Sequence, residues 1–181
     1  MAAFLYRNER LEKFHFECDS KKLEDYKIMK KYELIPESKI KVFGRTLYRI
    51  RACKDFTTVT GKEIRKGDIG GYVQKESNLS HDGNCWIGDD AKVFDNAQVC
   101  GDAEVYENAK VYGDALVFDN AQVYDYAHMC DNAKVYGNAQ ICGHAEVYGT
   151  TRVYDNAKIL SIAKVLGDSR IYGDAIVYGW P

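Results

Sequence analysis

Proline and long hydrophobic runs are scarce in this chain, and their scarcity excludes several classes of protein. Two prolines in 181 residues exclude collagen-like and proline-rich sequences. No stretch approaches the roughly 18 apolar residues that cross a bilayer, and the start, MAAFLYRNER, lacks the apolar centre of a signal peptide. The 25 basic and 27 acidic residues nearly balance, which excludes a disordered polyelectrolyte. We therefore expect a soluble, cytoplasmic protein with no membrane contact.

Metal-binding and disulfide patterns are also missing. The six cysteines show no C-x-x-C spacing, and a cytoplasmic chain does not keep disulfides, so we predict reduced thiols. The chain lacks the nine-residue glycine-rich repeat of calcium-binding β-helices, so its acidic residues are interpreted as turn formers. We predict no metal and no other cofactor.

What the chain does contain is a six-residue repeat from Ile87 to the C-terminus. Each unit reads aliphatic, aromatic, Gly or Asp, Asn or Asp, Ala, variable. The first position is aliphatic or Met in all sixteen occurrences, and the fifth is Ala in thirteen of fifteen, Thr151 and Ser169 being the exceptions. A period of six does not fit the 3.6-residue turn of a helix, and Gly or Asp in every unit would break one. The repeat is therefore extended.

The alternation within each unit predicts a short strand followed by a tight corner. Ala and the aliphatic residue point to one side of such a strand, and the variable and aromatic residues point to the other. Gly or Asp at the third position tolerates the positive φ of a corner. Stacked coils with a narrow Ala and Val interior follow, and fifteen units at three per coil predict about five three-sided coils.

The chain resembles the YdcK-like β-solenoid repeat family. The resemblance rests on LYRIRACKDFTTV, KGDIGGYVQKESNLS and GNCWIGDDAKVFD, and on the hexads that follow them. Its specific motif contains Gly70, Gly71, Asn78, Leu79, Ser80, Cys85 and Trp86. The resemblance implies an all-β solenoid in the form of a left-handed parallel β-helix. Proteins of this family are often encoded by a phage or prophage, which implies a location in the host cytoplasm.

Residues 1–80 lack the hexad pattern, and we expect them to form a small α+β capping head on a β-helix of residues 81–181. Alternation predicts a strand over 14–18, helical spacing predicts a helix over 19–32, and two strands over 39–43 and 45–53 flank Gly44. The glycine-rich segment 66–73 is expected to be the connecting bend. Because the end coils of a solenoid need a cap, we expect the head to cover the open first coil.

Charge also divides the chain near this boundary. Through Trp86 there are 18 basic and 13 acidic residues, net +5, and from Ile87 onward 7 basic and 14 acidic, net −7. A basic head can contact phosphates, but no recognised nucleic-acid module is present. Nucleic acid is therefore only a secondary candidate partner.

One row of corners departs from the consensus. The fourth position is Asn or Asp in eleven of sixteen units, and the exceptions are Tyr126, His144, Thr150, Ile162 and Trp180. Four of these five are eighteen residues apart, and Leu160 replaces the usual aromatic beside them. Apolar and aromatic residues in place of turn formers indicate an interface. We predict that Tyr126, His144, Leu160, Ile162 and Trp180 contact another copy or a protein partner.

Two functions from different classes fit these observations. The first is a non-catalytic, self-associating, protein-binding solenoid, for which residence in a phage would imply an inhibitor or decoy of a host defence system. The alternative is a hexapeptide-type acyltransferase with His144 or His128 as general base, oriented by Glu146. Against the alternative, the coils lack the long loop with which such transferases shape a substrate pocket. A shared fold alone assigns no reaction.

Overall fold

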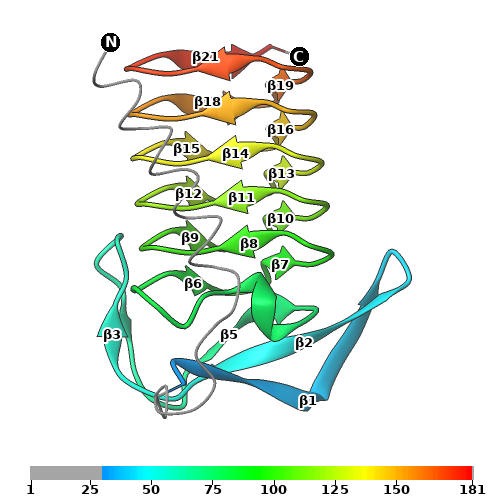
Figure 1. Ribbon diagram of the computed structural model, residues 1–181, viewed down its shortest axis with the longest axis vertical. Coiled ribbons are helices and arrows are strands. Elements are labelled where there is room, and N and C mark those ends of the chain that lie inside the picture. Colours follow the sequence, from blue (N-terminus) through cyan, green and yellow to red (C-terminus); the bar gives the residue numbers. More distant parts are fainter. Residues whose placement is uncertain (1–29, 181) are drawn as a thin grey trace, which may run out of the picture.

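The computed structural model describes residues 30–180, and nearly all of its regular structure is β-strand (Figure 1). The one helical element among these residues is the 3-10 turn η1 (Glu76–Asn78). The predicted all-β solenoid is confirmed. Its strands before the hexads are β1 (Tyr32–Val42), β2 (Arg45–Ala52), β3 (Phe56–Thr57), β4 (Glu63–Ile64) and β5 (Ile69–Val73).

The remaining strands form three parallel sheets, which we call faces 1, 2 and 3. Face 1 continues β1, β2 and β5 with β7 (Lys92–Val93), β10 (Lys110–Val111), β13 (His128–Met129), β16 (Glu146–Val147) and β19 (Lys164–Val165). Face 2 contains β8 (Gln98–Val99), β11 (Leu116–Val117), β14 (Lys134–Val135), β17 (Arg152–Val153) and β20 (Arg170–Ile171). Face 3 contains β6 (Trp86–Ile87), β9 (Glu104–Val105), β12 (Gln122–Val123), β15 (Gln140–Ile141), β18 (Lys158–Ser161) and β21 (Ile176–Gly179).

Strand register confirms a coil of eighteen residues. His128 pairs with Lys110 below and with Glu146 above, and the other faces repeat this spacing. There are six coils rather than the predicted five, because an irregular coil precedes the hexads. Val73 of β5 pairs in parallel with Val93, Leu79 bridges Val99, and β6 completes the turn. The prediction missed this coil because it lacks the six-residue pattern.

The corners follow the predicted turn chemistry. The third residue of each six-residue unit has a positive φ, between 50° and 77°, in all units from Asp89 to Gly173. Glycine and aspartate dominate these positions because they tolerate left-handed backbone. Aspartate adds a bond to the next coil: Asp125 Oδ2 accepts the N–H of Gly143 at 2.8 Å. Each such corner therefore also ties neighbouring coils together.

The interior consists of the predicted residues. The first-position aliphatic residues and the alanines are almost all buried, and Ala121 and Ala133 have no exposed surface. The exception Thr151 is also buried, and its hydroxyl donates to the carbonyl oxygen of Tyr148 at 2.8 Å. A buried hydroxyl is tolerated there because it is hydrogen-bonded.

This tight interior predicts the effect of a larger side chain. We expect Ala133→Leu to lower the free energy of unfolding by about 1–3 kcal/mol, because extra carbons in a packed core force strain. Urea unfolding followed by circular dichroism measures the change. Gln140→Leu, on an outward strand position, is the matched control and should change the stability by less than about 0.5 kcal/mol. Equal midpoints for both variants would contradict the packing argument.

The described part of the head contains strands, turns and the 3-10 element η1. The predicted strands 39–43 and 45–53 are confirmed by the β1–β2 hairpin, whose turn has Phe43 and Gly44 at positive φ. The predicted strand 14–18 lies outside the described residues. Residues 19–29 of the predicted helix 19–32 lie outside them too. Over residues 30–32 the helix prediction is wrong, because residues 30 and 31 are not helical and β1 begins at Tyr32. Figure 1 shows the hairpin crossing beneath the stack, at the end opposite the C-terminus.

The expected bend over 66–73 is corrected in part. Ile69–Val73 is a strand that pairs with both β2 and β7, so it joins the hairpin to the solenoid. A Cβ atom on Gly70 would lie 2.6 Å from the Ile87 carbonyl oxygen, and one on Gly71 would lie 2.6 Å from that of Ala91. The glycines are therefore needed for close approach of backbones rather than for a bend.

Polar side chains fix the irregular first coil. Asn78 is fully buried, and its Oδ1 accepts the N–H groups of Gln74 and Lys75 while its Nδ2 donates to the carbonyls of Asp95 and Ala97. The buried ammonium of Lys31 donates to the carbonyl oxygens of Gly83 (3.2 Å) and Cys85 (2.8 Å). None of the five cysteines among the described residues forms a disulfide bond with another described residue.

Basic residues of the head contact the acidic corners of the solenoid. Arg45 Nε lies 2.7 Å from Asp95 Oδ1, Arg49 Nη2 lies 2.6 Å from Asp90 Oδ1, and Lys62 Nζ lies 3.5 Å from Asp89 Oδ1. These ion pairs join the basic head to the acidic solenoid.

No helix in the described part of the chain is long and apolar enough to span a membrane.

Candidate protein interface

The structure brings the predicted interface residues to one edge of the solenoid. Tyr126, His144, Ile162 and Trp180 each follow a face 3 strand, and the first three precede the next face 1 strand. The Tyr126 N–H donates to the Gly143 carbonyl at 2.9 Å, and the His144 N–H donates to that of Ser161 at 2.7 Å. We call these four residues, together with the flanking Leu160, the corner stripe.

The corner stripe exposes large apolar and aromatic surface. Tyr126 is 54% exposed, Ile162 38% and Trp180 87%, whereas Leu160 is half-buried. The rings of Tyr126 and His144 stack in parallel, with centroids 4.8 Å apart and an interplanar angle of 4°. The stripe is therefore an ordered surface feature whose ring edges and whose Trp180 side chain face solvent.

Polar and charged residues border the stripe on face 1. His128, Glu146 and Lys164 stand in register on successive coils, and Lys164 Nζ lies 3.0 Å from Glu146 Oε2. Burial lowers the pKa of His128, and the nearby charge of Lys110 lowers it further, so neutral imidazole is favoured at neutral pH. These residues are suited to the polar rim of an interface.

The residues of the acyltransferase alternative lie near one another but differ in their contacts. The Glu146 carboxylate, the predicted orienting group, is paired with Lys164. The His144 ring stacks on Tyr126. Within residues 30–180 no three His, Cys, Asp or Glu side chains gather closely enough to hold a metal ion.

Aromatic ladders run along the faces, as the eighteen-residue spacing predicts. On face 2 the rings of Tyr136, Tyr154 and Tyr172 stack at 5.0 and 5.4 Å, and Phe118 extends the ladder at 4.8 Å from Tyr136. On face 1, burial raises the pKa of Tyr112 to about 12. Ring faces that cover each other stabilise the coils.

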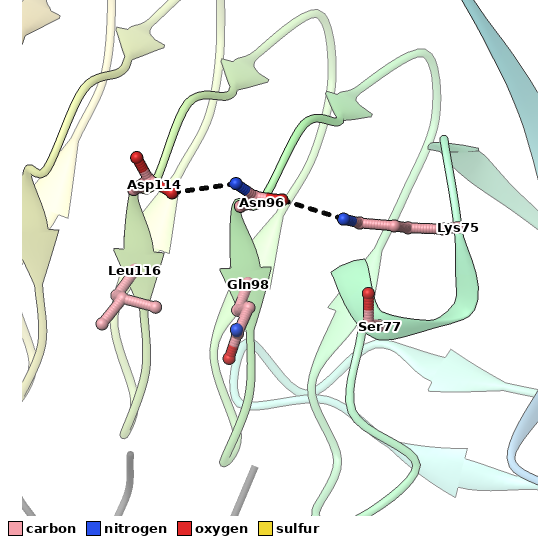
Figure 2. A pocket seen from close by; sticks show the side chains of 6 residues that line it. All are labelled: Lys75, Ser77, Asn96, Gln98, Asp114 and Leu116. Atoms are coloured by element: carbon pink, nitrogen blue, oxygen red, sulfur yellow. Dashed lines mark hydrogen bonds between the residues drawn. The ribbon is translucent and has the colours of Figure 1, made fainter. Parts of the chain in front are cut away.

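Sequence reasoning missed a second surface, on face 2. Lys134, Arg152 and Arg170 stand in register on consecutive coils. Below them lies a hollow of about 280 Å³ lined by Lys75, Ser77, Asn96, Gln98, Asp114 and Leu116. Figure 2 shows these six side chains. The eighteen-residue period would have revealed the three cations, whereas the hollow depends on the irregular first coil.

Comparison with known proteins supports the repeat and does not extend to activity. Residues 109–125 match the family model described as the YdcK β-solenoid repeat, which confirms the resemblance over the coil of β10, β11 and β12. No curated protein matches the chain significantly. The chain is thus a β-solenoid repeat protein.

Proposed function

We propose that this chain is a non-catalytic binding protein in which the rigid solenoid presents the corner stripe to a second copy or to a protein partner. The observation that carries the proposal is the exposure of Tyr126, Ile162 and Trp180 in one row. Exposed apolar residues gathered in one place favour a protein interface, whereas single exposed residues need no explanation.

The stripe has the composition of an interface core with a polar rim. Trp180 is the anchor, because a large aromatic side chain in a desolvated contact contributes most to binding. Glu146 and Lys164 supply charged groups at its edge. At about 4.8 Å per coil, four rows give a ridge about 14 Å long, which is a core that the adjoining faces must extend.

A binding protein of this kind acts by occupying its target. The resemblance to solenoids encoded by phages and prophages implies the finer form of the proposal, an inhibitor or decoy of a host defence system in the host cytoplasm.

The test is a double substitution, Ile162→Asp with Trp180→Asp. Charges in the apolar seam should reduce the mass of the assembly to that of one chain, or abolish capture of the partner, because a buried unpaired carboxylate disfavours association. Light scattering coupled to size exclusion measures the mass, and circular dichroism checks that the coils stay folded.

Leu166→Asp with Ile176→Asp is the matched control. Both side chains are exposed near the C-terminal end but lie outside the corner stripe. Unchanged mass and unchanged partner capture in the stripe variant, or an equal loss in the control, would contradict the proposal. A turnover screen with acetyl donors tests the acyltransferase alternative separately, with His144→Ala and His128→Ala as the diagnostic variants.

A further inference from the structure

The cations of the solenoid are arranged unevenly. All seven basic residues from Ile87 onward occupy the sixth, outward position of a unit, although this part of the chain has a net charge of −7. Three of the seven, Lys134, Arg152 and Arg170, follow one another on face 2. We call these three residues the cation row.

Among residues 30–180 the cation row has no ion-pairing partner, because no carboxylate there lies at ion-pairing distance from any of the three side chains. Burial lowers the pKa of Lys134, and the charge of Arg152 lowers it further. Like charges directly opposite each other destabilise a sheet. Face 1 differs, because Glu146 there pairs with Lys164.

The surface continues below the cation row. Gln98 and Leu116 occupy the same outward row on the two preceding coils, and both line the hollow. Lys75 lies at its lower end, where its Nζ donates to Asn96 Oδ1 at 2.9 Å (Figure 2). Face 2 therefore offers an apolar contact at Leu116 with cations above and below it.

We propose that face 2 binds an extended acidic segment of a partner protein, which lies along the solenoid axis with its carboxylates on the cation row and an apolar side chain against Leu116. The three cations span about 10 Å at one strand spacing per coil, and carboxylates on alternate residues of an extended chain recur about every 7 Å. Long arginine and lysine side chains can lean along the face, which bridges the difference between the spacing of the coils and the spacing of the carboxylates.

The neighbouring aromatic ladder favours an acidic peptide over single-stranded nucleic acid. Proteins that bind single strands stack bases on open aromatic faces. On face 2, the faces of Tyr136 and Tyr154 are covered by the rings above and below them. The solenoid's acidic residues also repel a continuous chain of phosphates.

The inference does not rest on the proposed function, because it concerns a different surface. Its test uses the full chain and a fluorescein-labelled heptapeptide with Leu at its first position and Glu at its third, fifth and seventh positions, all on one side of an extended chain, followed by anisotropy at low and high salt. We expect salt-sensitive binding to the wild type. Arg152→Glu with Arg170→Glu should weaken it at least tenfold, whereas Lys110→Glu with Lys158→Glu, which makes the same charge change on faces 1 and 3, should not.

Four outcomes would overturn the inference: no peptide binding by the wild type, equal loss in both charge variants, tighter binding of an oligothymidine than of the peptide, or loss of self-association in the Arg152→Glu, Arg170→Glu variant. The third would assign face 2 to nucleic acid and the fourth to a second copy. The variant Ile162→Asp, Trp180→Asp should bind the peptide like the wild type, which separates this result from that of the corner stripe.

Discussion

Replacing Asn78 by Leu is expected to cost about 3 kcal/mol or more of the free energy of unfolding. The side chain makes four hydrogen bonds inside the first coil, two as acceptor and two as donor. Leu would remove the partner of the Lys75 N–H and of the carbonyls of Asp95 and Ala97, whereas the Gln74 N–H also donates to the Val93 carbonyl. Each buried group left without a partner costs roughly 1–3 kcal/mol. Urea unfolding with circular dichroism measures the loss.

Two further variants make this measurement specific. Asn120→Leu is the matched control, because Asn120 is exposed and donates one bond, to Asn138, at 3.1 Å. It should change stability by less than about 0.5 kcal/mol. Asn78→Asp keeps the acceptor but places a carboxylate oxygen against the carbonyls of Asp95 and Ala97, so it should destabilise the coil at least as much as Asn78→Leu. Equal stabilities for Asn78→Leu and Asn120→Leu would show that the first coil does not depend on this side chain.

Deletion of residues 1–80 is expected to cause aggregation. The deletion removes β5, which bonds to β7, and Leu79, which bridges Val99, so the backbone edge and the apolar interior of the first regular coil become exposed. Unpaired strand edges are templates for association with other chains. Size exclusion and binding of a hydrophobic dye measure the result.

Shortening the chain at the other end provides the comparison. Removal of residues 163–180 takes away about one coil but leaves the N-terminal contacts in place, and we expect that protein to remain soluble. If the chain without residues 1–80 stays monomeric with an intact far-ultraviolet dichroism spectrum, the capping role predicted for the head is wrong.

The regular coils could be predicted from the sequence because one local rule determines them. A buried alanine such as Ala133, a buried aliphatic residue such as Val135 and a corner of positive φ recur in every unit, and each depends only on its own hexad and on the neighbouring coils. The register then follows from the period, which is why the stack of Tyr126 on His144 could also be expected.

The first coil could not be predicted in this way, because its contacts are individual and distant in sequence. Asn78 reaches Asp95 and Ala97, and Lys31 reaches Cys85 across fifty-four residues. Such pairs cannot be predicted from the six-residue period. Gly70 was interpreted as a bend for the same reason: its close approach to Ile87 is visible only when both strands are in place.

The two periods of this solenoid constrain changes in chain length differently. Inserting or removing six residues would preserve every buried alanine and every corner, because the core repeats with each unit. Placed between His144 and Arg152, such a change would also turn all later coils by one face, so that Ile162 would no longer stand above His144, nor Arg152 above Lys134. The fold therefore tolerates growth in steps of six, whereas its surfaces survive only steps of eighteen. Relatives that share a binding surface should differ in length by whole coils.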